Sequence, residues 1–165
     1  MCGIVGYIGQ RRVVPILLEG LKRLEYRGYD SAGLVYLQDG RLHKYRCEGK
    51  LANLEEVMDK VLTDSTIGLG HTRWATHGPP SEANAHPHCD CSGELVVVHN
   101  GIIENFQTLR EKLIAQGHVF TSQTDTEVLA HLIEEHLQED LVKAVRQALR
   151  GGRFICPGSD VAETA

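Results

Sequence analysis

A cysteine directly follows the first methionine, in the run Met1-Cys2-Gly3. A small second residue permits removal of the methionine, which leaves a thiol and a free α-amine on one residue. The ordinary pKa of an α-amine is about 8, so part of it is an unprotonated base near neutral pH. Such an amine can take the thiol proton, usually through a water, without a separate histidine. Position alone favours a packed small residue, because free cysteine packs well, so the other segments must decide.

A polar segment at residues 71–77 follows an expected strand and holds the chain's only tryptophan, Trp74, beside Arg73. The planar guanidinium of arginine binds a carboxylate through two parallel hydrogen bonds. A solvated strand end with a packed tryptophan is the alternative interpretation. The segment therefore indicates a carboxylate-binding site without establishing it.

Two further positions allow both a structural and a chemical interpretation. Asn100-Gly101 ends an expected strand. It predicts either a hairpin turn or an oxyanion hole built from the Asn100 side-chain amide and the Gly101 backbone N–H. Asp125 lies where a helix is expected to begin. Its carboxylate either stabilises the helix N-terminus or binds the α-ammonium group of an amino acid, and spacing favours the structural role.

Histidines and cysteines gather at residues 86–91, in the run His-Pro-His-Cys-Asp-Cys. These residue types bind zinc. The spacing fits none of the common zinc patterns, however, in which two well-separated pairs of ligands close a tetrahedron. We therefore predict no metal and no cofactor.

The composition is that of an ordinary globular domain, with 165 residues, 42% of them hydrophobic, and a net charge of −5. This charge gives no reason to expect nucleic acid or an anionic membrane as a partner. No apolar run approaches the length of a membrane span, and the first residues lack the features of a signal peptide. The five cysteines are irregularly spaced, which is not a disulfide framework. A reduced, cytoplasmic protein is therefore predicted.

Hydrophobic periodicity predicts an α+β domain with mostly antiparallel strands. Asp39-Gly40 marks a hairpin, Asn105 and Asp140 are expected to cap helices, and residues 124–127 have capping-box spacing. The expected strands cover residues 2–8, 31–37, 41–48, 66–72 and 95–99, and the expected helices cover residues 13–24, 51–62, 105–117, 124–137 and 140–150.

These segments together resemble the class II glutamine amidotransferases, a branch of the N-terminal nucleophile hydrolases. Within that class, the run LEYRGYDSAG at residues 24–33 is closest to the glutaminase domains of the glutamine–fructose-6-phosphate aminotransferases. Amidophosphoribosyltransferases usually have another residue where Tyr29 stands. The other segments that carry the resemblance are residues 71–77, 81–88, 97–105 and 124–128. The resemblance implies a four-layer αββα sandwich that is incomplete at its C-terminal end.

The resemblance also implies a role for each matching residue. Cys2 would attack the side-chain amide of L-glutamine, and Asn100 with Gly101 would form the oxyanion hole. Arg73 would hold the α-carboxylate. Asp125 would bind the α-ammonium group, which reverses the preference from spacing. The remaining expected substrate-binding residues line the pocket or close over it: Trp74, Thr76 and His77.

The resemblance runs through about Leu149, and residues 150–165 depart from the family pattern. We therefore expect residues 1–149 to form a glutaminase domain that lacks its last strands, followed by a divergent tail at residues 150–165. Full-length family enzymes have a sugar-phosphate isomerase domain that uses fructose 6-phosphate and mediates most oligomer formation, and that domain is expected to be absent. The alternatives are an inactive or partner-binding fragment and an amidotransferase domain that serves another ammonia acceptor.

Overall fold

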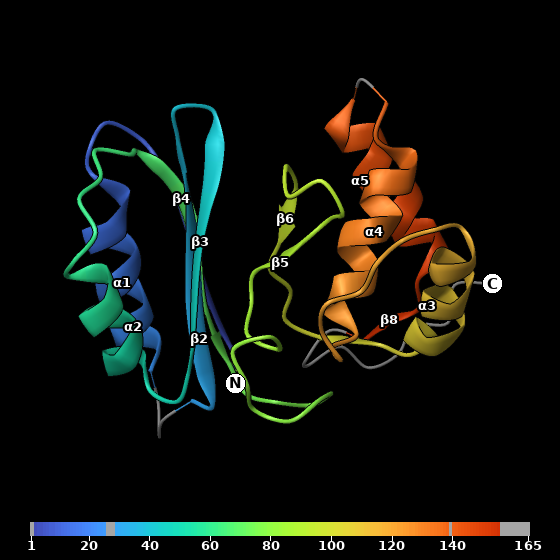
Figure 1. The fold of residues 1–165 in the computed structure, drawn as a ribbon, viewed down its shortest axis with the longest axis horizontal. Coiled ribbons are helices and arrows are strands. Elements are labelled where there is room, and N and C mark those ends of the chain that lie inside the picture. The colour runs from blue at the N-terminus through green and yellow to red at the C-terminus, as the bar shows by residue number, and fades with distance from the viewer. Residues whose placement is uncertain (1, 26–28, 139, 156–165) are drawn as a thin grey trace.

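The computed structural model describes residues 2–25, 29–138 and 140–155. Figure 1 shows the layers in order: two helices, a four-stranded sheet, a short two-stranded sheet, and a second group of helices. The helices are α1 (Val13–Leu24), α2 (Leu51–Met58), α3 (Phe106–Ala115), α4 (Thr126–His136) and α5 (Leu141–Gly151). The strands are β1 (Gly3–Ile8), β2 (Ser31–Gln38), β3 (Arg41–Glu48), β4 (Ile67–Arg73), β5 (His88–Cys89), β6 (Val96–Val97), β7 (Ile102–Ile103) and β8 (Phe154–Ile155). The α+β prediction is confirmed.

The strand β4 lies inside a sheet of order β1-β4-β2-β3, in which every pair is antiparallel. Asp39 and Gly40 connect β2 to β3 as predicted. Both residues have positive φ, 52° and 72°, as a type I′ turn requires. The last residue of β4 is Arg73, so its backbone is positioned by neighbouring strands on both sides. Part of the distinctive 24–33 motif, residues 26–28, lies outside the described residues.

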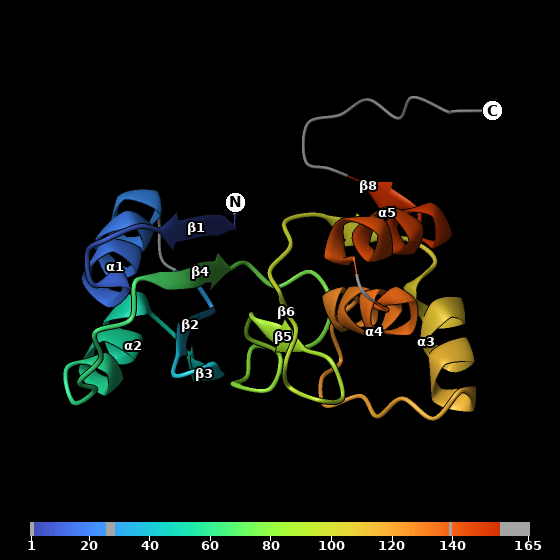
Figure 2. The same ribbon diagram turned by 90° about the horizontal axis from the view of Figure 1, so that it is seen from above.

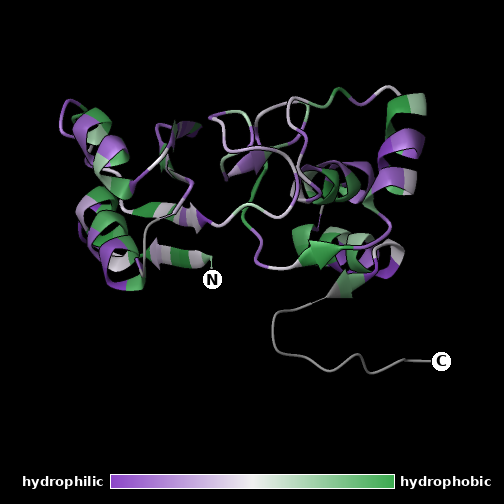
Figure 3. Cartoon of the chain, turned by 90° about the horizontal axis from the view of Figure 1, so that it is seen from below, coloured by the Kyte–Doolittle hydropathy of each residue, from purple (hydrophilic) through white to green (hydrophobic). Residues whose placement is uncertain are grey.

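The helices α1 and α2 cover one face of this sheet (Figure 1). Along α1 the predicted apolar stripe is buried at Val13, Leu17 and Leu21. These side chains form one core with Leu34 of β2 and Leu54 of α2. Full burial of a side chain of this size contributes roughly 1.5–3 kcal/mol. Hydrophilic residues share the same helices, as Figure 3 shows, so only one side of each helix faces the core.

The second half of the molecule is organised around α4, which packs against α3, α5, β5 and β6. Its residues Val128, Leu132 and Ile133 are buried in a second core. Figure 2 shows β5 and β6 between the four-stranded sheet and α4.

Among the described residues, no helix is both long enough and apolar enough to cross a membrane.

Two predicted helix caps are wrong. The side chain of Asn105 does not cap α3; it donates to the Gly151 carbonyl oxygen at 3.0 Å and accepts from the Arg153 N–H at 2.8 Å. Glu127, the expected partner in the capping box, instead accepts hydrogen bonds from the backbone and hydroxyl groups of residues 121–122. Both side chains tie distant segments together, which local spacing does not reveal.

The strands β7 and β8 pair with each other, and β5 pairs with β6. Sequence patterns predicted no strand at β5, β7 or β8, because two residues are too few to show a periodicity.

Asp140 caps α5 as predicted, and its carboxylate accepts from two backbone N–H groups. Residues 156–165 lie outside the described residues, so a domain boundary near residue 149 stays a prediction.

The face of the main sheet opposite α1 and α2 is only partly covered within the described chain. An apolar hollow of about 500 Å³ lies there, lined by residues of β1, β2, β3 and β4 and by Val96 of β6. Val35, Leu69 and Val96 are among its lining residues. Ile8, at the end of β1, is 81% exposed. Apolar surface therefore remains open beside the short second sheet.

Gly33 lies where β2 closely approaches the segment that carries His86. A Cβ atom at Gly33 would lie 2.1 Å from the His86 carbonyl oxygen and 2.9 Å from the Tyr45 carbonyl oxygen. We expect Gly33→Ala to lower the free energy of unfolding by about 2 kcal/mol or more, because backbone atoms would have to move. Urea unfolding measures this change.

Gly151→Ala is the matched control. A Cβ atom there meets no atom within 4 Å, and alanine is favoured over glycine in a helix by ~1 kcal/mol. This variant should keep or gain stability. Equal stabilities for Gly33→Ala and Gly151→Ala would contradict the close approach of β2 to the His86 segment.

Candidate active site

Cys2 lies just before β1, at the end of the main sheet where β4 finishes at Arg73. The pairing of Gly3 with Thr72 carries it to the end of β4. Its Sγ accepts a hydrogen bond from the Trp74 backbone N–H at 3.2 Å. The predicted nucleophile is thus in contact with the segment predicted to bind a carboxylate.

The side-chain amide of Asn100 connects Cys2 to a buried histidine. Its Nδ2 donates to the Cys2 carbonyl oxygen at 3.0 Å, and its Oδ1 lies 2.9 Å from His71 Nε2. Burial lowers the pKa of His71 to about 4. The ring is therefore neutral near pH 7, and its Nε2–H donates to Asn100 Oδ1. This bond turns the NH₂ group of Asn100 toward Cys2, which is the orientation that an oxyanion donor needs.

Gly101 follows Asn100 with a φ of 152°, a conformation that residues with a Cβ rarely adopt. The hairpin interpretation of Asn100-Gly101 is wrong, because β6 pairs with β5 while β7 pairs with β8. The segment is instead a connection between two small sheets that passes beside Cys2. Its geometry is compatible with the second oxyanion donor, the Gly101 N–H, whose role stays a prediction.

Arg73 is 4% exposed and is held by the loop that follows it. One guanidinium nitrogen, NH2, donates to the carbonyl oxygens of His77 and Gly78, the latter at 3.2 Å. The other nitrogen, NH1, is buried and makes no hydrogen bond within the described residues. Buried polar groups usually have a partner. This donor lacks a hydrogen-bond partner, and its role in binding a substrate carboxylate stays a prediction.

Asp30 fixes the loop that follows Arg73, a role that the sequence did not indicate. Its Oδ1 lies 3.7 Å from Arg73 NH1, and its Oδ2 accepts from the Ala75 backbone N–H. Ser31 Oγ donates to Asp30 Oδ1 at 2.9 Å. The only signal in the sequence is the place of Asp30 in the 24–33 motif, immediately before a buried strand.

Asp125 is 4% exposed, and its carboxylate does not cap α4. Oδ2 accepts from the Ile103 backbone N–H at 2.9 Å, and Oδ1 lies 3.9 Å from His77 Nδ1. The Asp125 side chain therefore does not cap α4 by a hydrogen bond and binds the backbone of β7 instead. Its role in binding the α-ammonium group of an amino acid stays a prediction.

The remaining predicted residues lie around this centre. Trp74 is 53% exposed, so its ring is not part of the core. His77 packs its ring edge-on against Phe106 with 4.9 Å between centroids. Thr76 is exposed. These positions are compatible with a pocket rim, and the substrate contacts of all three residues stay predictions.

A group of buried histidines supports the site from behind. His86 stacks on His71 with 4.1 Å between ring centroids and contacts His88 edge-on at 4.7 Å. Its Nδ1 accepts from the His99 backbone N–H at 3.4 Å. Burial lowers the pKa of His86 and of His88 well below the ordinary range. These neutral rings act as packing and hydrogen-bonding groups.

Comparison with known proteins identifies the family. The family described as "Glutamine amidotransferase domain" matches residues 55–147. The chain belongs to this family. A glutamine–fructose-6-phosphate aminotransferase (isomerizing) of Pyrococcus horikoshii is 54% identical over 156 residues, which cover 92% of this chain and 26% of the relative. The protein of the same name from Symbiobacterium thermophilum is 56% identical over 158 residues, with 94% of this chain and 26% of the relative covered. This amidotransferase chain thus spans about a quarter of the length of the curated relatives it matches.

Solved structures agree with this assignment. The glutamine phosphoribosylpyrophosphate amidotransferase from B. subtilis has a TM-score of 0.77 and 28% identity, covering 93% of this chain and 33% of that one. A structure described as the allosteric regulatory enzyme of purine biosynthesis has a TM-score of 0.79 and 28% identity, covering 93% and 34%. The amidotransferase chain therefore has the predicted fold of the N-terminal nucleophile hydrolases.

The burial of His71 predicts how the free energy of unfolding changes as the pH falls. Its folded pKa of about 4 lies below the ordinary value of about 6.5, so its contribution to stability is complete above about pH 6.5 and is lost as the pH falls toward 4. His71→Gln keeps a donor for Asn100 but removes this titration. We expect the stability of the variant to fall less steeply with acid, by about 1.4 kcal/mol per pH unit. Urea unfolding across this range measures both slopes. Equal slopes would mean that folded His71 is charged.

Proposed function

We propose that this chain hydrolyses the side-chain amide of L-glutamine and releases ammonia, with Cys2 as the nucleophile. The observation that carries the proposal is the contact of Cys2 with both Asn100 and the Arg73–Trp74 segment. A thiol, an amide donor held by a buried histidine, and a guanidinium nitrogen without a hydrogen-bond partner lie at one end of the sheet. Asp125 supplies a buried negative charge near the same loop.

The reaction follows from these groups. After removal of Met1, the α-amine of Cys2 takes the thiol proton and the sulfur attacks the amide carbon of glutamine. Negative charge develops on the amide oxygen, where Asn100 Nδ2 and the Gly101 N–H stabilise it. The amine then protonates the leaving nitrogen, and ammonia departs. Water hydrolyses the γ-glutamyl thioester to glutamate and restores the thiol.

Substrate recognition uses two opposite charges. The free donor of Arg73 binds the α-carboxylate of glutamine, and Asp125 binds its α-ammonium group. Thr76 and His77 line this part of the pocket, and Trp74 closes over the bound amino acid. An α-amino acid carries both charges, whereas a simple amide carries neither, so the pair selects glutamine over simple amides.

The ammonia acceptor is proposed from the relatives. Those named glutamine–fructose-6-phosphate aminotransferase are about four times as long as the matched part of this chain, so we propose that ammonia passes to a sugar-phosphate isomerase domain that binds fructose 6-phosphate. Oligomers would form mainly through that domain. The similarity to a phosphoribosylpyrophosphate amidotransferase keeps another acceptor as the second candidate.

Unpaired cysteines among the described residues suit a reducing cytoplasm.

Two substitutions separate binding from chemistry. Arg73→Lys keeps the positive charge but loses the fork, so it should mainly raise KM for glutamine. Asn100→Ala should mainly lower kcat, by roughly 10²–10³-fold, because it removes an oxyanion donor. Steady-state formation of glutamate measures both constants. Equal changes of KM and kcat in both variants would contradict this division of roles.

An electrophilic glutamine analogue tests the nucleophile. 6-Diazo-5-oxo-norleucine should modify Cys2 and leave Cys89 and Cys91 unmodified, because the site binds the amino-acid part of the analogue before the thiol attacks. Peptide mass spectrometry locates the label, and the intact mass shows whether Met1 is gone. An active preparation that retains Met1 would contradict the amine mechanism. Equal labelling of all cysteines, with no glutamine hydrolysis, would favour the partner-binding alternative.

A further inference from the structure

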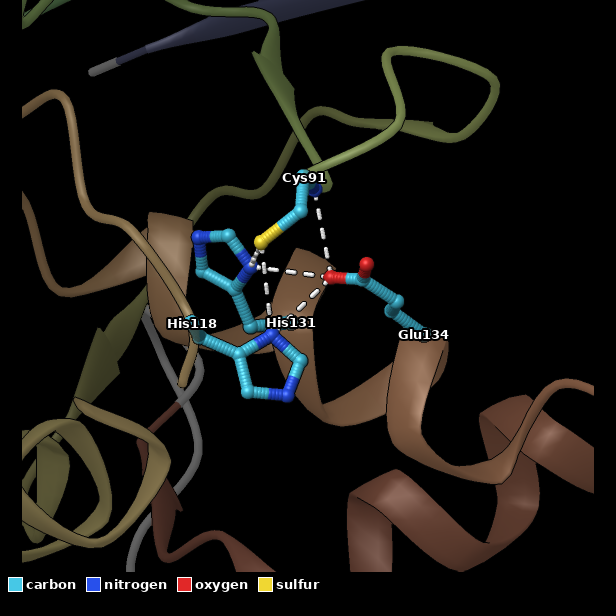
Figure 4. Close-up of side chains that lie close together, drawn as sticks. All are labelled: Cys91, His118, His131 and Glu134. Atoms are coloured by element: carbon cyan, nitrogen blue, oxygen red, sulfur yellow. Dashed lines mark hydrogen bonds and ion pairs between the residues drawn. The ribbon is translucent and has the colours of Figure 1, made fainter. Parts of the chain in front are cut away.

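Four side chains outside the proposed active site turn their ligand atoms toward one point (Figure 4). These atoms, Cys91 Sγ, His118 Nδ1, His131 Nδ1 and a Glu134 carboxylate oxygen, all lie within 4.8 Å of one another. The sulfur lies 3.5 Å from each imidazole nitrogen. Glu134 Oε2 lies 3.0 Å from His118 Nδ1 and 3.1 Å from His131 Nδ1.

The four residues come from three separate segments. Cys91 lies in the turn between β5 and β6, and its backbone N–H also donates to Glu134 Oε2 at 3.1 Å. His118 lies in the connection between α3 and α4. His131 and Glu134 share one face of α4, because residues three apart are neighbours on a helix. The cluster therefore joins a turn, a loop and a helix.

We propose that this cluster is a structural Zn²⁺ site. Zinc–sulfur bonds of ~2.3 Å and zinc–nitrogen bonds of ~2.05 Å place tetrahedral S and N ligands ~3.6 Å apart, and N and O ligands ~3.3 Å apart. The observed separations of 3.5 Å and of 3.0–3.1 Å agree with these values. One thiolate, two imidazoles and a carboxylate are ligands that zinc accepts. Four protein ligands close the tetrahedron and leave no position for substrate, so the metal holds structure.

The outer ring nitrogens of both histidines face carboxylates. His118 Nε2 lies 2.9 Å from Glu135 Oε1, and His131 Nε2 lies 4.0 Å from Glu127 Oε1. Histidine ligands of metals usually donate their second N–H to such a group, which fixes the ring and the tautomer. Both rings turn Nδ1 inward, and His118 also has the outer hydrogen bond of a metal ligand, whereas His131 Nε2 is buried near Glu127 without a hydrogen bond.

Hydrogen bonds alone explain the cluster less well. For one Glu134 oxygen to accept from both rings, each Nδ1 must carry a proton. His118 would then be protonated on both nitrogens if it also donates to Glu135. The His118 side chain is only 8% exposed, and burial of a charged ring is costly. A zinc ion replaces the inward protons and satisfies the sulfur, the two nitrogens and the carboxylate together.

The run 86–91 taken by itself has none of the common zinc spacings. The structure takes one residue of that run, Cys91, and brings it to His118 and His131, which lie far along the chain. A short local pattern contains no sign of this arrangement, since each of the three segments supplies only one or two ligands.

Zinc binding tests the proposal on the purified chain, reduced, stripped with a chelator and titrated with Zn²⁺ against a chromophoric competitor. About one Zn²⁺ per chain should bind, with a rise in the temperature of unfolding. Cys91→Ser should weaken binding by more than the ~10- to 100-fold that loss of an outer-shell partner costs. Cys89→Ser is the matched control: that thiol lies two positions away and contacts Lys44 instead, so binding should be unchanged.

Cobalt spectroscopy identifies the ligands without relying on stability. The titration uses the Cys2→Ala chain, so that the thiol and amine at the start of the chain do not compete for metal. Co²⁺ should give intense visible bands of a tetrahedral site and a thiolate-to-cobalt charge-transfer band, and the added Cys91→Ser change should abolish the latter. No stoichiometric Zn²⁺ binding, or binding and cobalt spectra that are unchanged by Cys91→Ser, would overturn the proposal.

Discussion

The antiparallel register of β1 on β4 determines where the groups of the proposed site meet. Gly3 pairs with Thr72, so Cys2 lies one step further, beside the residues that end β4. Val5 and Tyr7 of β1 pack against the core under α1 and α2. A shift of one residue would turn these side chains to the opposite face of the sheet. The hydrophobic core thus fixes the register, and the register brings the thiol to the Arg73 loop.

The charge distribution at this end of the sheet suits a zwitterionic ligand. Arg73 contributes to the lowered pKa values of His71, His86 and His88, although burial is the larger cause for each ring. The rings are therefore neutral near pH 7 and add no positive charge beside the guanidinium. Asp30 partly compensates Arg73, while Asp125 lies 3.9 Å from His77. In the proposed site, the guanidinium of Arg73 and the carboxylate of Asp125 are the two groups that would face an amino acid.

The sequence predicted the long, periodic elements and named the residues of the proposed site, but it did not predict the residues that position them. The bounds of α1 and β3 agree with the prediction because each has a clear apolar pattern or turn. Asp30 and His71 were missed as positioning groups, since contacts between distant segments leave no local spacing. The same reason explains the wrong caps at Asn105 and Glu127, whose side chains bind groups outside their own helices.

The helix α4 connects the proposed active site to the proposed zinc site. Asp125 immediately precedes α4, and Glu127 in its first turn binds residues 121–122. In the chain, the proposed zinc ligand His118 precedes residues 121–127 and the proposed ligand His131 follows them. A bound zinc ion would therefore link the start of the loop that ends at Asp125 to the helix that follows it. Zinc binding stabilises the folded chain by mass action. It affects glutamine binding only so far as the metal-free chain populates another arrangement of this loop, because a ligand shifts an equilibrium only by its differential affinity for the two states.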